Sequence, residues 1–158
     1  MGGGLKLSKA LEDHAQRWSE IMPLILRRLI AAAGEAAAQL ELSMTQAEVI
    51  SYLSEKQETT MGELSDHISV SLSAMTGVVD RLVQKGSVSR DRDETDRRVV
   101  RVRLTPAGEN LATEVLQTKK AHAMAVLGAL SESDRERLLE IMAKLTQNLS
   151  SKYPSNVR

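Results

Sequence analysis

The stretch that decides the fold runs from residue 76 to residue 108 and reads TGVVDRLVQKGSVSRDRDETDRRVVRVRLTPAG. Its first ten residues carry apolar side chains at helical spacing. Gly86 follows them and predicts a helix end, because glycine adopts the left-handed conformation there without a steric penalty. Thr105 and Pro106 predict the next helix start, since a hydroxyl cap precedes a proline whose missing N–H is harmless at the first helical position.

The connection between these two helices predicts a β-hairpin with a charged tip. Apolar residues and arginines alternate with the period of two that a half-buried strand requires, as Val100, Arg101, Val102, Arg103 and Leu104. The tip is DETDRR at residues 93–98. A helix followed by an arginine-tipped hairpin is the layout of a winged helix, for which duplex DNA is the expected target.

Charge is concentrated in the same region. The whole chain has a net charge of zero, yet residues 81–103 hold eight basic side chains against four acidic ones, a local charge of +4. Such clustering is typical of a nucleic-acid-binding surface. The alternative is a charged hairpin that is simply solvated.

Three short helices are predicted before the hairpin. The first begins at Ser43 or Thr45, because Ser43 with Gln46 and Thr45 with Glu48 both fit the capping-box spacing. Thr60 and Glu63 form a further capping box for the second helix, and Ser69 or Ser71 caps the third, over residues 72–85. Three helices and a hairpin make a helix-turn-helix with a wing.

Long helices are predicted at both ends. Residues 8–42 carry a wide apolar stripe, in which Pro23 predicts a kink or a break. A second helix runs from Pro106 to about Leu130, and a final one begins at a capping box of Ser133 and Glu136. These helices are apolar over more surface than a small winged helix covers, so we expect a second copy to pack on them. The alternative is a four-helix platform within one chain.

The expected fold class is therefore mainly α with a small β wing. We divide the chain into an N-terminal dimerisation helix (1–42), a winged helix-turn-helix DNA-binding lobe (43–105) and C-terminal dimerisation helices (106–158).

Composition excludes several other classes of protein. The 158 residues include no cysteine, which excludes a disulfide framework, a thiolate zinc site and a thiol-based sensor. The three histidines are widely separated, and no phosphate-binding loop, metalloprotease helix or serine elbow occurs, so we expect no metal, no cofactor and no enzymatic activity. No signal peptide or membrane-spanning stretch is visible, which predicts a soluble cytoplasmic protein.

The third short helix is the candidate reading helix. With Leu72, Met75, Val79 and Leu82 facing inward, the outward set is Ser71, Ser73, Ala74, Thr76, Gly77, Asp80 and Arg81. Small hydroxyl side chains permit close approach to the major-groove floor and hydrogen bonds to base edges. The alternative for Ser71 and Ser73 is that they only cap the helix.

The hairpin tip supplies the candidate wing contacts. We expect Arg98 to enter the minor groove, Asp96 to orient its guanidinium, and Arg92 and Arg97 to meet phosphates. Arg90 is a further candidate DNA-binding residue of the wing. The alternative is a surface ion pair of little consequence.

These residues together resemble the MarR family of winged-helix regulators. The resemblance rests on the DRL–KG helix end, the DRR wing tip and the strand ending LTPAG, and it covers about residues 43–110. It implies a homodimer on a pseudo-palindromic operator, with reading helices in successive major grooves and wings in the flanking minor grooves. Asp96 and Arg98 would take the family's wing roles, while Gly77 departs from it, because many members carry arginine there.

The resemblance also implies a ligand. Family members commonly bind small, often aromatic, anions between the dimer helices and the DNA-binding lobe, and this weakens DNA binding. Here His14, Arg17 and Trp18 are the candidate effector pocket, since arginine could pair a carboxylate and Trp18 could stack on a ring. Trp18 as an ordinary dimer-core residue is the alternative, and an aliphatic ligand or none remains open.

The resulting hypothesis is a homodimeric, sequence-specific regulator of transcription that binds double-stranded DNA, a repressor rather than an activator, released by a small-molecule effector. The alternative is a winged-helix module that binds proteins and not DNA.

Overall fold

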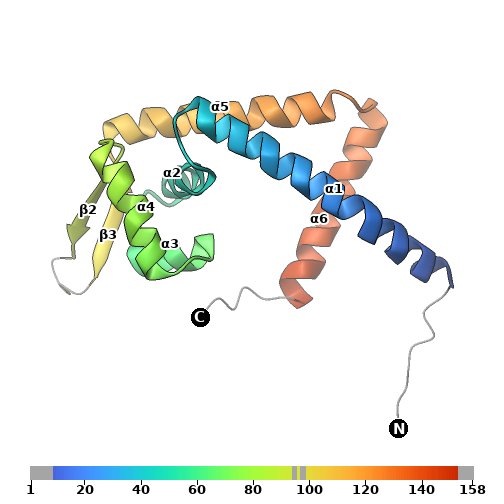
Figure 1. Cartoon of the computed structure of the whole chain (residues 1–158), viewed down its shortest axis with the longest axis horizontal. Helices are drawn as coiled ribbons and strands as arrows, with labels where there is room; N and C mark the ends of the chain where they lie inside the picture. The colour runs from blue at the N-terminus through green and yellow to red at the C-terminus, as the bar shows by residue number, and fades with distance from the viewer. Residues whose placement is uncertain (1–8, 94–95, 97–98, 153–158) are drawn as a thin grey trace, which may run out of the picture.

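The computed structural model describes residues 9–93, 96 and 99–152 (Figure 1). It is mainly helical with one small sheet, as the sequence predicts. The elements in chain order are α1 (Lys9–Gln39), α2 (Met44–Lys56), β1 (Glu58–Thr60), α3 (Met61–Ile68), α4 (Leu72–Gln84), β2 (Val88–Arg92), β3 (Val100–Leu104), α5 (Pro106–Leu127) and α6 (Glu132–Lys152).

Side-chain caps start the helices of the central lobe. Ser43 and Gln46 form the capping box of α2, and Thr60 and Glu63 form that of α3. The alternative box at Thr45 is therefore wrong, because Thr45 already lies inside the helix. Ser71, not Ser69, caps α4 by accepting a hydrogen bond from the Ala74 N–H. These caps satisfy backbone donors that would otherwise lack partners.

The Glu63 carboxylate gives a testable pH dependence. It accepts hydrogen bonds from the Thr60 N–H, the Thr60 hydroxyl and the Thr59 hydroxyl, and these bonds, that of the Thr60 backbone first, hold the pKa of Glu63 below its ordinary value of 4.5. A lowered pKa means that the folded state favours the ionised form. The contribution of Glu63 to the free energy of unfolding is thus fully present above its ordinary pKa. It is lost as pH falls through the pKa that Glu63 has in the folded state.

We expect Glu63→Gln to lower the free energy of unfolding at pH 7, although glutamine still accepts one hydrogen bond at this cap. The difference from the unmodified protein should shrink as pH falls below about 4.5, where the unfolded chain takes up a proton at Glu63, and vanish once Glu63 is protonated in the folded state as well. Urea denaturation at several pH values between 7 and 3 measures this difference. A difference that stays constant over that range would contradict the role of ionised Glu63.

The sheet has three antiparallel strands in the order β1-β3-β2. The prediction of a two-stranded hairpin was incomplete, because it lacked β1, a strand of three polar residues between two helices. Its sequence has no alternation of apolar and polar residues to indicate a strand. β3 is central, with Val102 facing Thr59 on one side and Arg90 on the other. The hairpin is thereby tied to the segment that enters α3.

One aliphatic core holds the central lobe together. It is formed by side chains of α2, α3, α4 and β3 that are wholly buried, namely Val49, Ile50, Leu53, Leu64, Met75, Val79, Leu82 and Val102. Ala37 from the end of α1 and Val115 from α5 complete it. The lobe is therefore a winged helix-turn-helix to which the ends of two long helices are firmly packed.

A tight backbone junction joins the end of α4 to the start of α5. Gly86 has a φ of 73°, the left-handed conformation that the sequence predicts. The Thr105 hydroxyl donates to the Gly86 carbonyl at 2.6 Å, and the Thr105 N–H donates to the Ser87 carbonyl at 3.1 Å. Gly108 lies directly against that Ser87 carbonyl. The KGS and LTPAG segments are thus two halves of one junction.

The terminal helices differ in detail from the prediction. α1 continues through Pro23, so the predicted break does not occur. α5 ends at Leu127, three residues before Leu130, and the cap of α6 is Ser131, whose hydroxyl accepts from the Asp134 N–H. The box predicted at Ser133 is therefore wrong, because the helix has already begun at Glu132.

The helix α6 packs on no other element of the described chain beyond isolated contacts. It overlaps α1 in the view of Figure 1 without packing against it. The alternative of a four-helix platform within one chain is therefore wrong, because the helices do not bury their apolar faces on one another. Within the described ranges, none of the helices is long and apolar enough to cross a membrane.

Candidate nucleic-acid interface

The reading helix α4 buries one stripe and exposes the rest. Met75, Val79 and Leu82 are wholly buried, as predicted. Leu72 is not, because it lies in the first helical turn beyond the core, and 54% of it is exposed. The predicted inward position of Leu72 is wrong. It instead lines a hollow with Thr76 of the same helix and Val100 of β3.

The predicted outward set of α4 lies on the opposite side. Ser71, Ser73 and Ala74 are exposed, and Thr76 and Gly77 are half-buried. The Ser71 hydroxyl serves as the cap, and the Thr76 hydroxyl donates to the Leu72 carbonyl at 2.8 Å. The Ser73 hydroxyl has no hydrogen-bond partner in the part of the chain that the structure describes, so it can both donate to and accept from an approaching base.

Arg81 folds back along α4 onto Gly77. Its Nε donates to the Gly77 carbonyl at 3.0 Å, and a Cβ at Gly77 would lie 3.8 Å from its Nη2. The absent side chain thus leaves the surface of that turn open to the exposed Arg81 guanidinium. The sequence predicts Arg81 on the outward face of this helix, and the structure adds the contact that holds its guanidinium over the turn at Gly77.

The wing is connected to the reading helix by an ion pair. Arg90 of β2 pairs with Asp80 of α4, so its guanidinium is already engaged by a carboxylate. Arg92 is exposed at the end of β2. The structure therefore distinguishes two arginines that the sequence treats alike: Arg90 links the wing to α4, and Arg92 extends outward.

The predicted tip residues are only partly described. Arg97 and Arg98 lie outside the described residues. The Asp96 N–H donates to Asp93 Oδ1 at 3.0 Å, and the Asp96 carbonyl accepts from the Val99 N–H at 2.8 Å. Asp93, a residue that sequence reasoning did not single out, thus binds the Asp96 backbone beside the ends of the two strands.

The outer face of the sheet carries alternating charges. Arg101 pairs with Glu58 and Asp93, and Arg103 pairs with Asp91 and, at 4.0 Å, with Glu58. Hydrogen bonds to Asp93 first and then to Glu58 raise the pKa of Arg101 above its ordinary value. These two arginines contribute to the local +4, yet in the structure each already has carboxylate partners.

The predicted effector residues share one face of α1. His14, Arg17 and Trp18 line a shallow, open hollow together with apolar side chains of the same helix. No other element contributes to this hollow among the residues that the structure describes. The Trp18 side chain is 53% exposed.

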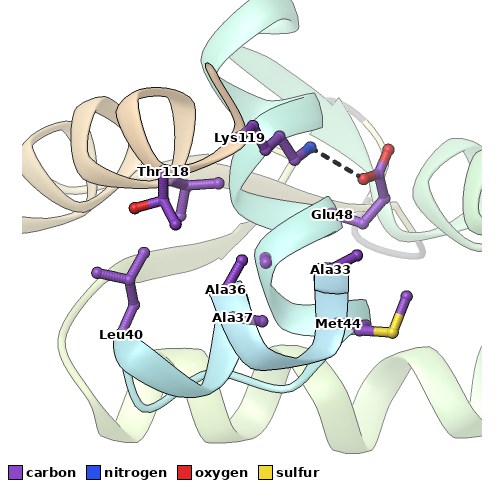
Figure 2. Close-up of a pocket in the computed structure, with 10 residues that line it drawn as sticks. Ala33, Ala36, Ala37, Leu40, Met44, Glu48, Thr118 and Lys119 are labelled. Atoms are coloured by element: carbon purple, nitrogen blue, oxygen red, sulfur yellow. Dashed lines mark hydrogen bonds and ion pairs between the residues drawn. The ribbon is translucent and has the colours of Figure 1, made fainter. Parts of the chain in front are cut away.

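A different cavity lies where α1, α2 and α5 meet (Figure 2). Its volume is about 90 Å³, and its walls are mostly alanine and other apolar side chains. Glu48 and Lys119 line it and form an ion pair at 3.2 Å. Sequence reasoning missed this cavity because its walls come from three separate segments, although the alanine-rich end of α1 is a local signal of close helix packing.

This arrangement defines a winged helix-turn-helix protein, and comparisons with known proteins identify the family. The MarR family signature matches residues 42–100. The HTH-type transcriptional regulator YpoP of Bacillus subtilis is 30% identical over 66% of this chain and 74% of its own length. The HTH-type transcriptional repressor MdtR of the same organism is 31% identical over 70% of this chain and 71% of its own.

The solved structures agree on the fold. A mutant of E. coli MarR complexed with operator DNA has a TM-score of 0.69 and 23% identity, and the match covers 84% of this chain and 96% of that one. The chain therefore belongs to the MarR family of transcriptional regulators, which confirms the resemblance. Its relatives are regulators and not enzymes, as the sequence predicts.

Proposed function

We propose that this protein is a homodimeric repressor that binds a pseudo-palindromic operator in double-stranded DNA in the cytoplasm. The observation that carries the proposal is the pairing of an open, hydroxyl-bearing face on α4 with a wing held beside it by the Asp80–Arg90 ion pair. A helix with small outward side chains can approach base edges in the major groove. The operator complex of the E. coli relative supports DNA as the target.

The dimer is supported by the apolar faces of the terminal helices. Trp18, Ile21, Ile25 and Leu29 follow one face of α1 and are each more than 40% exposed. α6 likewise exposes large apolar side chains, among them Leu139, Met142 and Leu149. Contiguous apolar surface of this extent is typical of a protein–protein interface. We therefore propose that 1–42 and 106–158 form the dimerisation part and that 43–105 contacts DNA.

The effector remains part of the proposal, with two candidate locations. The face with His14, Arg17 and Trp18 would be covered in such a dimer. The cavity of Figure 2 instead lies between the terminal helices and the DNA-binding lobe. At about 90 Å³ it is smaller than the roughly 150 Å³ cavity that holds benzene. An aromatic anion entering this cavity would move α5 away from α2. A ligand that binds better to the conformation with the wider spacing would lower the population of the conformation that binds DNA.

Two substitutions test the DNA contacts on an operator selected from genomic fragments. We expect Ser73→Ala to change the ranking of operators that differ at single bases, because it removes a hydroxyl that reads base edges. Arg98→Ala should lower the affinity for all of these operators by a similar factor, since its proposed contact is the same in each of them. Fluorescence anisotropy measures both, and Ser54→Ala, far from α4 in sequence, is the matched control.

The same assay distinguishes DNA binding from the protein-binding alternative. Affinity should fall steeply with salt concentration as counterions are released from the phosphates. If the unmodified protein binds no genomic fragment at low salt, the proposed function is wrong and the protein-binding alternative is favoured.

A further inference from the structure

Three carboxylates lie on the outer face of the sheet, beside the proposed DNA-binding surface. Glu58 is at the start of β1, Asp91 is in β2, and Asp93 follows β2. A carboxylate near the phosphate backbone repels it, and this repulsion weakens binding. Their presence within a cluster of arginines therefore needs a physical reason other than charge attraction to DNA.

The contacts of Arg101 supply that reason for Glu58 and Asp93. Its Nη1 lies 2.9 Å from Glu58 Oε1, and its Nε pairs with Asp93 Oδ2. Arg101 faces Thr60 and Asp91 in the sheet register, so both contacts run diagonally across the strands. One guanidinium thus spans the sheet from β1 to the residue after β2.

Both ends of this bridge are fixed to other parts of the lobe. Asp93 is only 10% exposed at its side chain, and its Oδ1 also accepts a hydrogen bond from the Asp96 N–H. Glu58 lies two residues before Thr60, the cap of α3, and the charge of Arg101 also contributes to the lowered pKa of Glu63 in that helix. The bridge therefore connects Asp93, directly after β2 of the wing, to the segment that enters α3.

We propose that Glu58 and Asp93 are positioning residues: they hold Arg101 as a strut that fixes the wing relative to the helices that contact DNA. In this role Arg101 contacts no phosphate, although it belongs to the basic cluster. The proposal rests on the proposed DNA-binding function, which it refines by separating arginines that orient the wing from arginines that meet DNA.

The proposal makes a prediction opposite in sign to simple electrostatics. Glu58→Gln and Asp93→Asn each remove a negative charge near DNA, so charge attraction alone would strengthen binding. We expect each to weaken operator binding about fivefold, the affinity equivalent of one surface ion pair. Glu55→Gln is the matched control, because Glu55 is exposed and has no partner in the described part of the chain; its affinity should be unchanged or slightly higher.

Two further readouts separate positioning from general stability or direct contact. Base changes in the operator flanks that the wing contacts should lower the affinity of the two variants by a smaller factor than they lower that of the unmodified protein. Arg101→Gln should leave the slope of log affinity against log salt unchanged, whereas loss of a phosphate contact would reduce it by about 0.9. Once Arg101→Gln is present, Glu58→Gln should weaken binding much less than it does alone, because only its 4.0 Å contact with Arg103 remains. Thermal melts verify that every variant is folded.

Tighter binding by Glu58→Gln and Asp93→Asn, or a reduced salt slope for Arg101→Gln, would overturn the strut. Failure of the unmodified protein to bind DNA would instead refute the proposed function, so the two failures are distinguishable.

Discussion

Gly108→Ala is expected to lower the free energy of unfolding by about 3 kcal/mol, at the upper end of the usual cost of inserting a methyl group into a packed site. A Cβ at Gly108 would lie 1.9 Å from the Ser87 carbonyl oxygen, 3.0 Å from its carbon and 3.2 Å from Leu104 Cδ2. The first two are backbone atoms and cannot rotate away. Relief therefore requires the start of α5 to move from the end of α4, which breaks the hydrogen bond from the Thr105 N–H to Ser87.

Circular dichroism during heating or urea titration measures this effect. A loss of that size corresponds to a fall in Tm of roughly 10 °C for a chain of this length. Gly62→Ala is the matched control, because its Cβ would meet nothing closer than the Thr60 hydroxyl at 3.9 Å. That control should keep or slightly raise stability, since alanine is the better helix former. Equal melting of the Gly108 variant and the unmodified protein would refute the close packing of this junction.

Ile25→Glu is expected to dissociate the proposed dimer and to reduce operator affinity by at least about 100-fold, the lower end of what linking two binding modules adds. Ile25 lies on the exposed apolar face of α1 that also carries Trp18 and Leu29. In a two-fold interface the change appears twice, and each carboxylate would be buried without a partner. A monomer then binds only one half-site of the operator, so the affinity gained by linking two lobes is lost.

Sedimentation velocity measures the association state, and anisotropy measures the affinity for the operator. Ala31→Glu is the control, because Ala31 is exposed and lies roughly 120° around α1 from Ile25, and the substitution introduces the same charge. It should remain dimeric and bind normally. A dimeric Ile25→Glu protein with unchanged affinity would show that this face of α1 is not the interface.

Features encoded by neighbouring residues were predictable from the sequence. The caps at Thr60 and Thr105, and the left-handed Gly86, agree with the structure, because each depends on contacts within a few residues. The box at Ser133 was wrong for a related reason: several serines there fit the spacing, and only the actual helix start at Glu132 selects Ser131.

Features that join distant segments were not predictable. β1 was missed because its three residues become a strand only by pairing with β3, more than forty positions away. Leu72 was misplaced because helical spacing gives the direction of a side chain but not where the core ends. The cavity of Figure 2 needs α1, α2 and α5 to meet, so no single stretch of sequence contains it.

The sequence by itself determined the order of the helices and of the hairpin strands, most of the caps and the family, because these depend on local spacing and on motifs that are contiguous in the chain. Only the tertiary structure decided which arginines are free to face a partner. Glu58 and Arg101 are 43 residues apart, and Lys119 is 71 residues from Glu48, yet both pairs are in contact. The interaction between two charges depends on their distance in space, and the packing of the core sets that distance.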